Sequence, residues 1–316
     1  MSDNEEEEEE EVAVVHDEIN FQFEDIFSDV DKEIPTLAEI RSSATKFNDA
    51  HRYILQKMIM TPCITLKRFN IMFIEYVVTR KLKRHPSVVK YIRAKSIELK
   101  DLAKTITKTI NNAKTYDTEE DDIGEHELGM RLVISSEETS PQEWVTLICE
   151  VQNSEVIGET SEITKSEREL FLTIIDELFE NNGKVTRKSI NQIATEKFKL
   201  TLLKSEKFIN HMVKERYLKT SDDNRFIELA PRLVAEMDPY LRAKFSATIK
   251  VCELCRKIIS RQEYSAECDK CEKYMHLNCF NNAVEISDQN GVECQGCSKI
   301  IDKDEVLLAV QNKLGK

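Results

Sequence analysis

The chain has 316 residues, of which 33% are charged, and it contains only 7 Gly and 6 Pro. This length allows two or three domains, and the scarcity of turn-forming residues favours helix-rich domains over a β-sandwich. No apolar run reaches the roughly 18 residues that a membrane-spanning helix needs. Met1 leads into acidic residues rather than into a signal peptide. We therefore expect a soluble protein with no membrane contact, in a reducing compartment.

The formal net charge of −13 is divided unevenly along the chain. Residues 1–50 carry a balance of −14, whereas residues 51–114 carry +12. Like charges at high density resist collapse, so the acidic run of residues 5–11 predicts a disordered arm over residues 1–48. A short basic cluster is a candidate for weak, sequence-independent DNA contact, or alternatively for a solvated helix end whose cations suit the helix dipole. It consists of Arg80, Lys81, Lys83 and Arg84.

Residues 49–155, called domain A below, have the outline of a winged-helix domain. Apolar residues recur at helical spacing over residues 51–59, 66–82 and 88–111. Prolines between these stretches separate the three expected helices. Two strands follow, over residues 131–135 and 144–151, joined by a polar loop. Three helices followed by a hairpin are typical of a winged helix.

The same outline repeats over residues 163–247, called domain B. Ser166 and Glu169 have the spacing of a capping box ahead of the first helix, and Asn182-Gly183 ends that helix. We expect further helices over residues 186–197, 204–216 and 231–245, with a tight wing turn at residues 222–224. The helix over residues 204–216 has the position that reads DNA in helix-turn-helix proteins. Its mixed charges favour contact with another protein instead.

Residues 252–297 hold seven of the nine cysteines and one histidine, in four pairs whose members are separated by two residues. Each such pair presents two ligands to one side of a tetrahedral Zn²⁺, so eight ligands suffice for two closed sites. A disulfide framework would need an oxidising compartment, and a thioredoxin-like motif would explain one pair rather than four. We therefore expect two zinc ions in a small domain over residues 250–300, folded by its metal and followed by a tail over residues 301–316.

The order of these ligands resembles the RING and PHD zinc-finger families, in which alternate pairs share a metal in a cross-brace. The resemblance implies two ligand sets, the first being Cys252, Cys255, His276 and Cys279 and the second Cys268, Cys271, Cys294 and Cys297. Val292 stands where PHD fingers carry an aromatic residue, which favours a RING. Leu254 fits the apolar residue with which RING ligases contact a ubiquitin-conjugating enzyme. Gln295-Gly296 and Ser298 replace the usual proline and basic residue, which indicates a variant RING with a weakened ubiquitin-transfer surface.

Two tandem winged helices followed by this zinc domain resemble the non-SMC element one family, the RING-like subunits of the SMC five/six complex. The resemblance covers residues 51–300, and its best local motifs are residues 51–56, 237–241, 250–255 and 274–279. It implies a mostly α, α+β protein with two winged helices and a two-zinc cross-brace. The family also implies a nuclear, chromatin-associated subunit that acts in DNA repair and recombination. Its partners would be a MAGE-type subunit, a kleisin subunit and the SMC five/six core.

The same resemblance implies a RING-type E3 ubiquitin transferase, slow alone and stronger with the MAGE-type partner. A RING docks a charged conjugating enzyme and holds no covalent intermediate, so no catalytic nucleophile is expected. Two alternatives remain, an architectural scaffold without catalysis and a PHD-like histone reader. Four further residues are expected not to be ligands: the two cysteines among them lie far from the zinc pairs and are expected to be core residues, and the two histidines lack neighbours at ligand spacing and are expected to be structural. They are Cys63, Cys149, His51 and His211.

Overall fold

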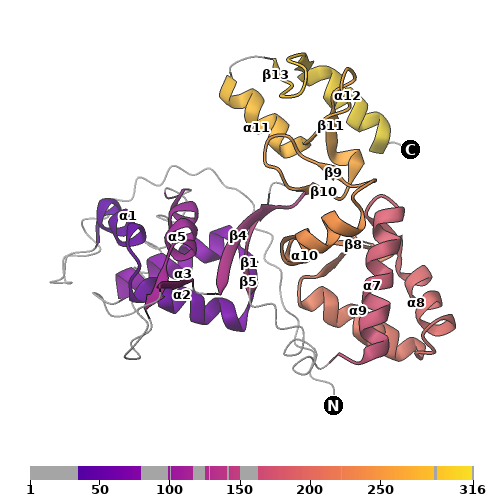
Figure 1. Ribbon diagram of the computed structural model, residues 1–316, viewed down its shortest axis with the longest axis horizontal. Coiled ribbons are helices and arrows are strands. Elements are labelled where there is room, and N and C mark those ends of the chain that lie inside the picture. Colours follow the sequence, from indigo (N-terminus) through magenta and orange to yellow (C-terminus); the bar gives the residue numbers. More distant parts are fainter. Residues whose placement is uncertain are drawn as a thin grey trace, which may run out of the picture.

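A computed structural model shows two winged-helix domains and a cysteine-rich domain, each with its own cluster of buried apolar side chains (Figure 1). It describes residues 35–79, 99, 101–116, 125–127, 129–140, 142–149, 163–221, 223–287 and 290–314. The basic cluster of Arg80, Lys81, Lys83 and Arg84 lies outside the described residues, as does most of the acidic arm. No described helix is long and apolar enough to cross a membrane.

Domain A has a three-stranded antiparallel sheet in the order β1-β5-β4, with helices packed against it. A second small hairpin joins β2 and β3. The elements in chain order are α1 (Leu37–Thr45), α2 (Asp49–Met60), β1 (Cys63–Thr65), α3 (Leu66–Thr79), α5 (Leu102–Asn111), β2 (Lys114–Tyr116), β3 (Glu125–Glu127), β4 (Met130–Ser136) and β5 (Glu143–Cys149). The first strand pairs with the last, which is the winged-helix arrangement.

The helix α1 corrects the predicted boundary of the acidic arm at residue 48. The Oγ1 of Thr36 caps the backbone N–H of Glu39, and the Glu39 carboxylate accepts a hydrogen bond from the Thr36 N–H, which completes a capping box. Ile40 and Ala44 on this helix are fully buried in the core of domain A. The folded body therefore begins before Leu37, because an apolar stripe within the acidic region finds a partner in the domain.

Domain B repeats the topology of domain A, with a sheet in the order β6-β8-β7. Its elements are α7 (Lys165–Glu180), β6 (Lys184–Thr186), α8 (Arg187–Glu196), α9 (Leu202–Lys214), β7 (Leu218–Thr220), β8 (Phe226–Leu229) and α10 (Pro231–Lys244). The capping box lies two residues earlier than predicted, between Thr164 and Glu167, because Thr164 has the extended backbone that a cap needs. The helix α10 packs against β4 and β5 of domain A, so the two winged helices are in direct contact.

The cysteine-rich domain extends over residues 250–314 and includes the segment that was predicted as a tail. It contains three hairpins, which are β9 (Lys250–Val251) with β10 (Ile258–Ile259), β11 (Ser265–Glu267) with β12 (Tyr274–His276), and β13 (Gly291–Glu293) with β14 (Ile300–Asp302). A 3-10 turn (Gln262–Tyr264) and the helices α11 (Leu277–Ser287) and α12 (Lys303–Leu314) complete it. Ile301, Val306 and Val310 are buried in its core, so the predicted tail is part of the fold.

The predicted fold class is confirmed as α+β, with small sheets in a largely helical chain. His51 and Cys63 are buried in domain A. Cys149, predicted as a core residue, is instead exposed at the end of β5, and His211 is exposed on α9.

Candidate metal centre

Three of the four ligand pairs lie in hairpins that share one hydrogen-bond pattern. In each, the strand residue before the first cysteine pairs with the residue seven positions later, as Val251 does with Ile258. The N–H of the first cysteine donates to a carbonyl five residues on, and its own carbonyl accepts from the N–H four residues on, at 2.8–2.9 Å. This turn points both sulfurs of a pair the same way, so each pair offers two ligands to one ion.

The residue after each of these pairs has left-handed backbone, although none is glycine. Arg256, Glu272 and Ser298 have φ values of 61°, 55° and 56°. Such a conformation costs a non-glycine residue roughly 1–2 kcal/mol. In all three hairpins the same two backbone hydrogen bonds close the turn and offset this cost. A bound cation would further hold the turn together.

The first ligand set gathers at the junction of two chain segments and is called site one. Its four ligand atoms, from Cys252, Cys255, His276 and Cys279, all lie within 4.8 Å of one another. The His276 Nδ1 faces the sulfurs of Cys255 at 3.3 Å and Cys279 at 3.8 Å. On its other side, His276 Nε2 is 3.0 Å from the Ile258 carbonyl. An Nε2–H that donates to this carbonyl leaves the Nδ1 lone pair free for a metal.

The protonation of site one depends strongly on the crowding of its ligands. Hydrogen bonds from the thiols of Cys255 and then Cys279 hold the pKa of the Cys252 thiol far below its ordinary value. Burial lowers the pKa of His276, but hydrogen bonds to Cys252 and Cys255 outweigh it and raise that pKa to about 12. A cation at this site must therefore displace protons, so its retention weakens as pH falls.

The second ligand set, called site two, consists of four cysteines whose sulfurs also lie within 4.8 Å of one another. Its members are Cys268, Cys271, Cys294 and Cys297. The Cys268 and Cys297 sulfurs are 3.6 Å apart, and those of Cys271 and Cys294 are 3.4 Å apart. Burial raises the pKa of Cys268, but backbone N–H groups of Lys270 and Cys271 lower it to about 7 overall. Gly296 allows the Cys271 sulfur to come close to the turn of the fourth ligand pair, because a Cβ at residue 296 would lie 3.1 Å from that sulfur.

The donor sets fit a soft, tetrahedral divalent ion. One site offers three thiols and an imidazole, the other four thiols, and both are combinations found in structural zinc sites. The first and third pairs form site one, and the second and fourth form site two, so the pairs alternate along the chain. These are the two sets expected from the cross-brace resemblance. All four positions of each site belong to the protein, which leaves no open position for a substrate.

Comparison with known proteins finds similar chains in sequence and in structure. No family model matches. The Non-structural maintenance of chromosomes element 1 homolog of Xenopus laevis is 26% identical over 139 residues, which are 43% of this chain and 49% of that protein. The match thus spans about half of the relative. A solved chain of the Nse1-Nse3-Nse4 complex is 18% identical and superposes with a TM-score of 0.54, over 81% of this chain and 97% of that one.

The chain resembles non-SMC element one in sequence and in fold. This confirms the resemblance expected from the sequence motifs. Two residues favoured a RING over a PHD finger in the sequence. Leu254 lies half-buried against the core of the cysteine-rich domain, within the first ligand pair. Val292 is buried in that core.

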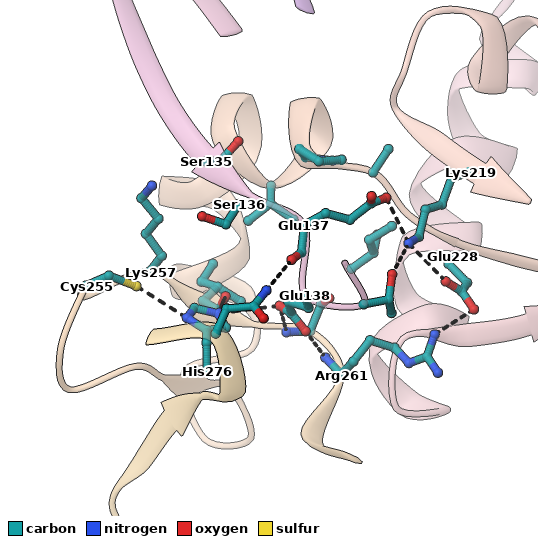
Figure 2. A pocket seen from close by; sticks show the side chains of 18 of the residues that line it. Ser135, Ser136, Glu137, Glu138, Lys219, Glu228, Cys255, Lys257, Arg261 and His276 are labelled. Atoms are coloured by element: carbon teal, nitrogen blue, oxygen red, sulfur yellow. Dashed lines mark hydrogen bonds and ion pairs between the residues drawn. The ribbon is translucent and has the colours of Figure 1, made fainter. Parts of the chain in front are cut away.

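Several polar residues beside site one were not predicted from the sequence. The loop between β4 and β5, residues 137–142, is called wing A, and it reaches the cysteine-rich domain (Figure 2). Glu138 of wing A and Asn278 of the third ligand pair make the contacts. A small cavity of about 90 Å³ beside them is lined by Cys255, His276 and Cys279. In the sequence wing A is only a polar loop, and no local pattern signals its partner.

Proposed function

We propose that the chain is the two-zinc, RING-like subunit of an SMC five/six-type complex, with a role in chromosome maintenance, DNA repair and recombination. The observation that carries this proposal is the order of parts: two winged helices of one topology, then two interleaved Cys/His sites. The similarity to non-SMC element one supports it. Copurification from nuclear extract, with identification of the captured proteins, tests it directly. If the chain is recovered without any SMC-type protein, the proposed function is contradicted.

The metal in both sites is zinc, on this proposal, and its role is structural. Zinc would be held by Cys252, Cys255, His276 and Cys279 in site one and by the four cysteines of site two, where it supplies the cross-links that a small core lacks. Metal analysis of protein prepared without chelator should give two zinc ions per chain. One or none would overturn this part of the proposal.

The partners proposed are a MAGE-type subunit, a kleisin subunit and the SMC core, on chromatin in the nucleus. The fold match to a chain of the Nse1-Nse3-Nse4 complex supports the first two. The mixed charges of α9 suit a protein partner better than base reading. The proposal also includes weak DNA binding that falls as salt concentration rises. The residues proposed for it are Arg80, Lys81, Lys83 and Arg84. Replacing all four with Gln should reduce binding to random duplex DNA without weakening the partner complex.

The biochemical activity proposed is RING-type ubiquitin transfer, enhanced by the MAGE-type partner. Leu254 is the candidate contact with the conjugating enzyme, since it lies half-exposed in the first ligand pair. Leu254→Ala removes an apolar contact and no metal ligand. In a reconstituted pair with several conjugating enzymes, it should reduce chain formation while partner binding stays intact. Absence of transfer in every combination would contradict ligase activity.

One feature favours a scaffold as the second candidate function. The last ligand pair contains Gln295-Gly296, and Gly296 packs tightly against Cys271 and Lys273, so this loop offers no side chain at that position to a conjugating enzyme. For a scaffold, Cys268→Ala should weaken the partner complex because it loosens the whole cysteine-rich domain. Leu254→Ala should then leave ubiquitin transfer unchanged, because a scaffold transfers little ubiquitin to begin with. The two variants together distinguish the two functions.

A further inference from the structure

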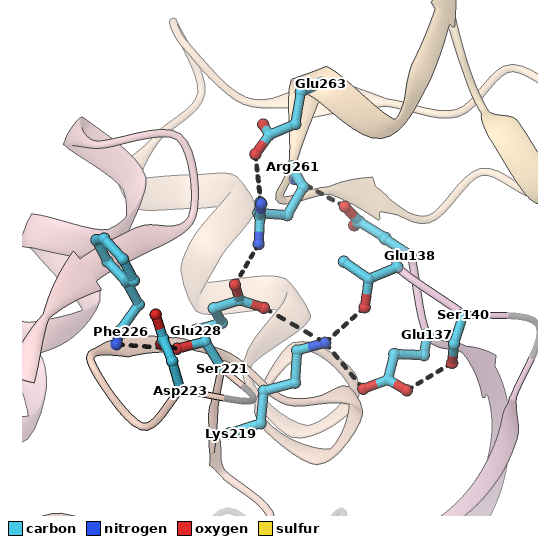
Figure 3. A network of polar contacts seen from close by, with 11 residues as sticks. Glu137, Glu138, Ser140, Lys219, Ser221, Asp223, Phe226, Glu228, Arg261 and Glu263 are labelled. Carbon is cyan, nitrogen blue, oxygen red and sulfur yellow. Dashed lines mark hydrogen bonds and ion pairs between the residues drawn. The ribbon is translucent and has the colours of Figure 1, made fainter. Parts of the chain in front are cut away.

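Wing A lies between domain B and the cysteine-rich domain, at the point where all three domains meet (Figures 2 and 3). The strand β4 carries it there, away from the core of domain A (Figure 1). Its tip is polar, yet its two glutamates are largely enclosed: the Glu137 side chain is 19% exposed and that of Glu138 is 12% exposed. A polar loop enclosed in this way must find partners for its charges.

Glu138 uses both carboxylate oxygens on the backbone of the cysteine-rich domain. One oxygen accepts a hydrogen bond from the Ser260 N–H and the other from the Arg261 N–H, each at 2.7 Å. These two residues directly follow β10, the strand whose Ile258 carbonyl holds the His276 ring. Charge-assisted hydrogen bonds of this kind are among the strongest in proteins. They fix the Glu138 carboxylate relative to the first hairpin of the domain.

The same carboxylate faces the outer edge of a site-one ligand. Glu138 Oε1 is 3.6 Å from His276 Nε2, too far for a hydrogen bond but close enough for electrostatic attraction. The His276 side chain is 11% exposed, so little water screens the contact. A negative charge behind an imidazole strengthens its Nε2–H donor and the basicity of Nδ1. Nδ1 is the atom that faces the sulfurs.

A second link joins wing A to the ligand pair that contains His276. Asn278 lies between His276 and Cys279 in the third ligand pair. Its Nδ2 donates to the carbonyls of Glu137 and Ser140, both at 3.0 Å. Wing A thus contacts the chain beside both pairs that form site one.

Domain B holds wing A from the opposite side through a chain of ion pairs (Figure 3). Lys219 on β7 pairs with Glu137 at 2.9 Å and donates to Thr139 Oγ1 at 2.7 Å. Lys219 also pairs with Glu228, which pairs in turn with Arg261 at 2.6 Å. The carboxylate of Glu137 therefore contacts domain B, whereas that of its neighbour Glu138 contacts the cysteine-rich domain. This difference provides a matched pair of residues for experiment.

Site two has no comparable attachment. Within the described part of the chain, no hydrogen bond or ion pair joins its four cysteines to either winged helix. Its surroundings belong to the cysteine-rich domain alone, as with Lys299, which pairs with Asp269 beside it. The two candidate metal sites therefore differ in whether a neighbouring domain supports them.

We propose that Glu138 is a positioning residue for the site-one ligand His276, through which wing A couples the docking of the cysteine-rich domain to metal retention at site one. The proposal rests on the two-zinc function proposed above. Docking of wing A holds His276 in its ligand orientation and places a negative charge behind it. A wing that left the junction would weaken site one and leave site two unchanged.

The test measures metal release from each site separately. Full-length protein is loaded with Co²⁺, because a site of three thiolates and one imidazole absorbs at different wavelengths from a site of four thiolates. Excess chelator is added and both bands are followed. Glu138→Gln keeps the size of the side chain, removes its charge and spoils one of the two backbone hydrogen bonds. Loss of such a supporting contact weakens metal binding by ~10-fold or more, so we expect release from site one to accelerate by about that factor.

Two further variants make the result specific. Glu137→Gln makes the same charge change one residue away, where the carboxylate contacts Lys219 of domain B and the Ser140 hydroxyl of wing A but not the cysteine-rich domain, so release from site one should stay close to wild type. Asn278→Ala cuts the second link to the same ligand pair and should accelerate release from site one. In all three variants site two should release its metal at the wild-type rate.

Several outcomes would overturn the coupling. Equal acceleration at both sites would show general loosening of the domain, and no acceleration at either would show that wing A does not support the ligand. An equal effect of Glu137→Gln and Glu138→Gln would point to the domain interface as a whole. A wild-type chain that binds fewer than two metal ions would instead contradict the proposed function, so the two failures are distinguishable.

Discussion

Domains A and B share one topology and differ in what their wings do. Wing A is enclosed at the three-domain junction, with both of its glutamates paired to other domains. The wing of domain B is a tight turn that closes on itself: Asp223 accepts hydrogen bonds from the Ser221 hydroxyl at 2.6 Å and from the Arg225 N–H at 3.1 Å. Topology therefore does not decide the role of a wing. Its length and its side chains do.

Domain B reaches the cysteine-rich domain by other means. The turn after α7 comes so close that a Cβ at Gly183 would lie 2.5 Å from the Ser260 carbonyl oxygen. Ile258 of the cysteine-rich domain is buried in the core of domain B. The contact of domain B thus contains an apolar, close-packed part beside the Glu228–Arg261 ion pair, whereas wing A contributes a polar contact made through a loop. The two contacts should respond differently to perturbation.

Removal of metal should give the largest effect and separate the two wings most clearly. Structural zinc contributes about 10–16 kcal/mol to the folding of small zinc domains, so excess chelator should unfold the cysteine-rich domain. The amides of wing A should then exchange rapidly with solvent deuterium, while the hydrogen-bonded amides of Ser221, Asn224 and Arg225 keep their protection. Hydrogen exchange followed by mass spectrometry measures both, and added zinc should restore wing A. A wing A that stays protected without metal would show that its docking is independent of the cysteine-rich domain.

Gly183→Ala tests the close-packed contact of domain B. Gly183 has φ of 79°, which strains any side chain, and its Cβ would meet a backbone oxygen that cannot move aside easily. We expect the free energy of unfolding to fall by roughly 1–3 kcal/mol, measured by chemical denaturation. The control is Asn182→Gly, because Asn182 has φ of 53° and glycine adopts that backbone without strain. A Gly183→Ala variant as stable as wild type would mean that the turn can move away from Ser260.

Replacing one acidic residue in each wing by its neutral amide compares the two wings directly. The Glu137–Lys219 pair has side chains 19% and 24% exposed, whereas the Asp223–Arg225 pair has side chains 42% and 76% exposed. Enclosed charge pairs stabilise more than solvated ones, so Glu137→Gln should lower the free energy of unfolding by roughly 1–2 kcal/mol. Asp223→Asn should cause no measurable change, since the amide oxygen still accepts both hydrogen bonds. Equal effects in denaturation experiments would contradict the difference between the wings.

A pH titration should produce the smallest effect, and of the two winged-helix domains domain A should be the one affected. His51 is buried there, and burial lowers its pKa below the ordinary value of 6.5, whereas His211 of domain B is exposed. The unfolded chain then binds more protons than the folded one, so this contribution is complete above pH 6.5 and is lost as pH falls below it. The His51 ring contacts α1 at the Ala44 carbonyl, and its Nδ1 accepts a hydrogen bond from the Asn48 N–H at 3.3 Å that protonation would break, so α1 should loosen first in acid. Hydrogen exchange of α1 between pH 7 and pH 5 measures this, with His51→Gln as a variant whose α1 should lose the pH dependence.

The candidate metal sites could be predicted because their information is local. Each ligand pair spans four residues, and in three of the four the turn that orients the pair is closed by hydrogen bonds within six residues. Helix boundaries were predicted for the same reason, since α3 and α10 follow apolar spacing and proline breaks. Where the prediction was wrong, short apolar stripes needed a distant partner to become folded. The helix α1 needed the core of domain A, and Val306 and Val310 of α12 needed that of the cysteine-rich domain.

The sequence by itself determined the fold class, the repeat of the winged helix and the presence of eight paired ligands, because periodicity and spacing act over a few residues, while the alternation of the pairs was implied by the family resemblance. Only the tertiary structure decided which wing is enclosed and which metal site it supports. Glu138 and its partner Ser260 are 122 positions apart, and a glutamate in a polar loop has no local property that separates a docked carboxylate from a solvated one. The distinction arises when three cores pack together and remove water from one charge, which then needs the backbone N–H groups beside site one.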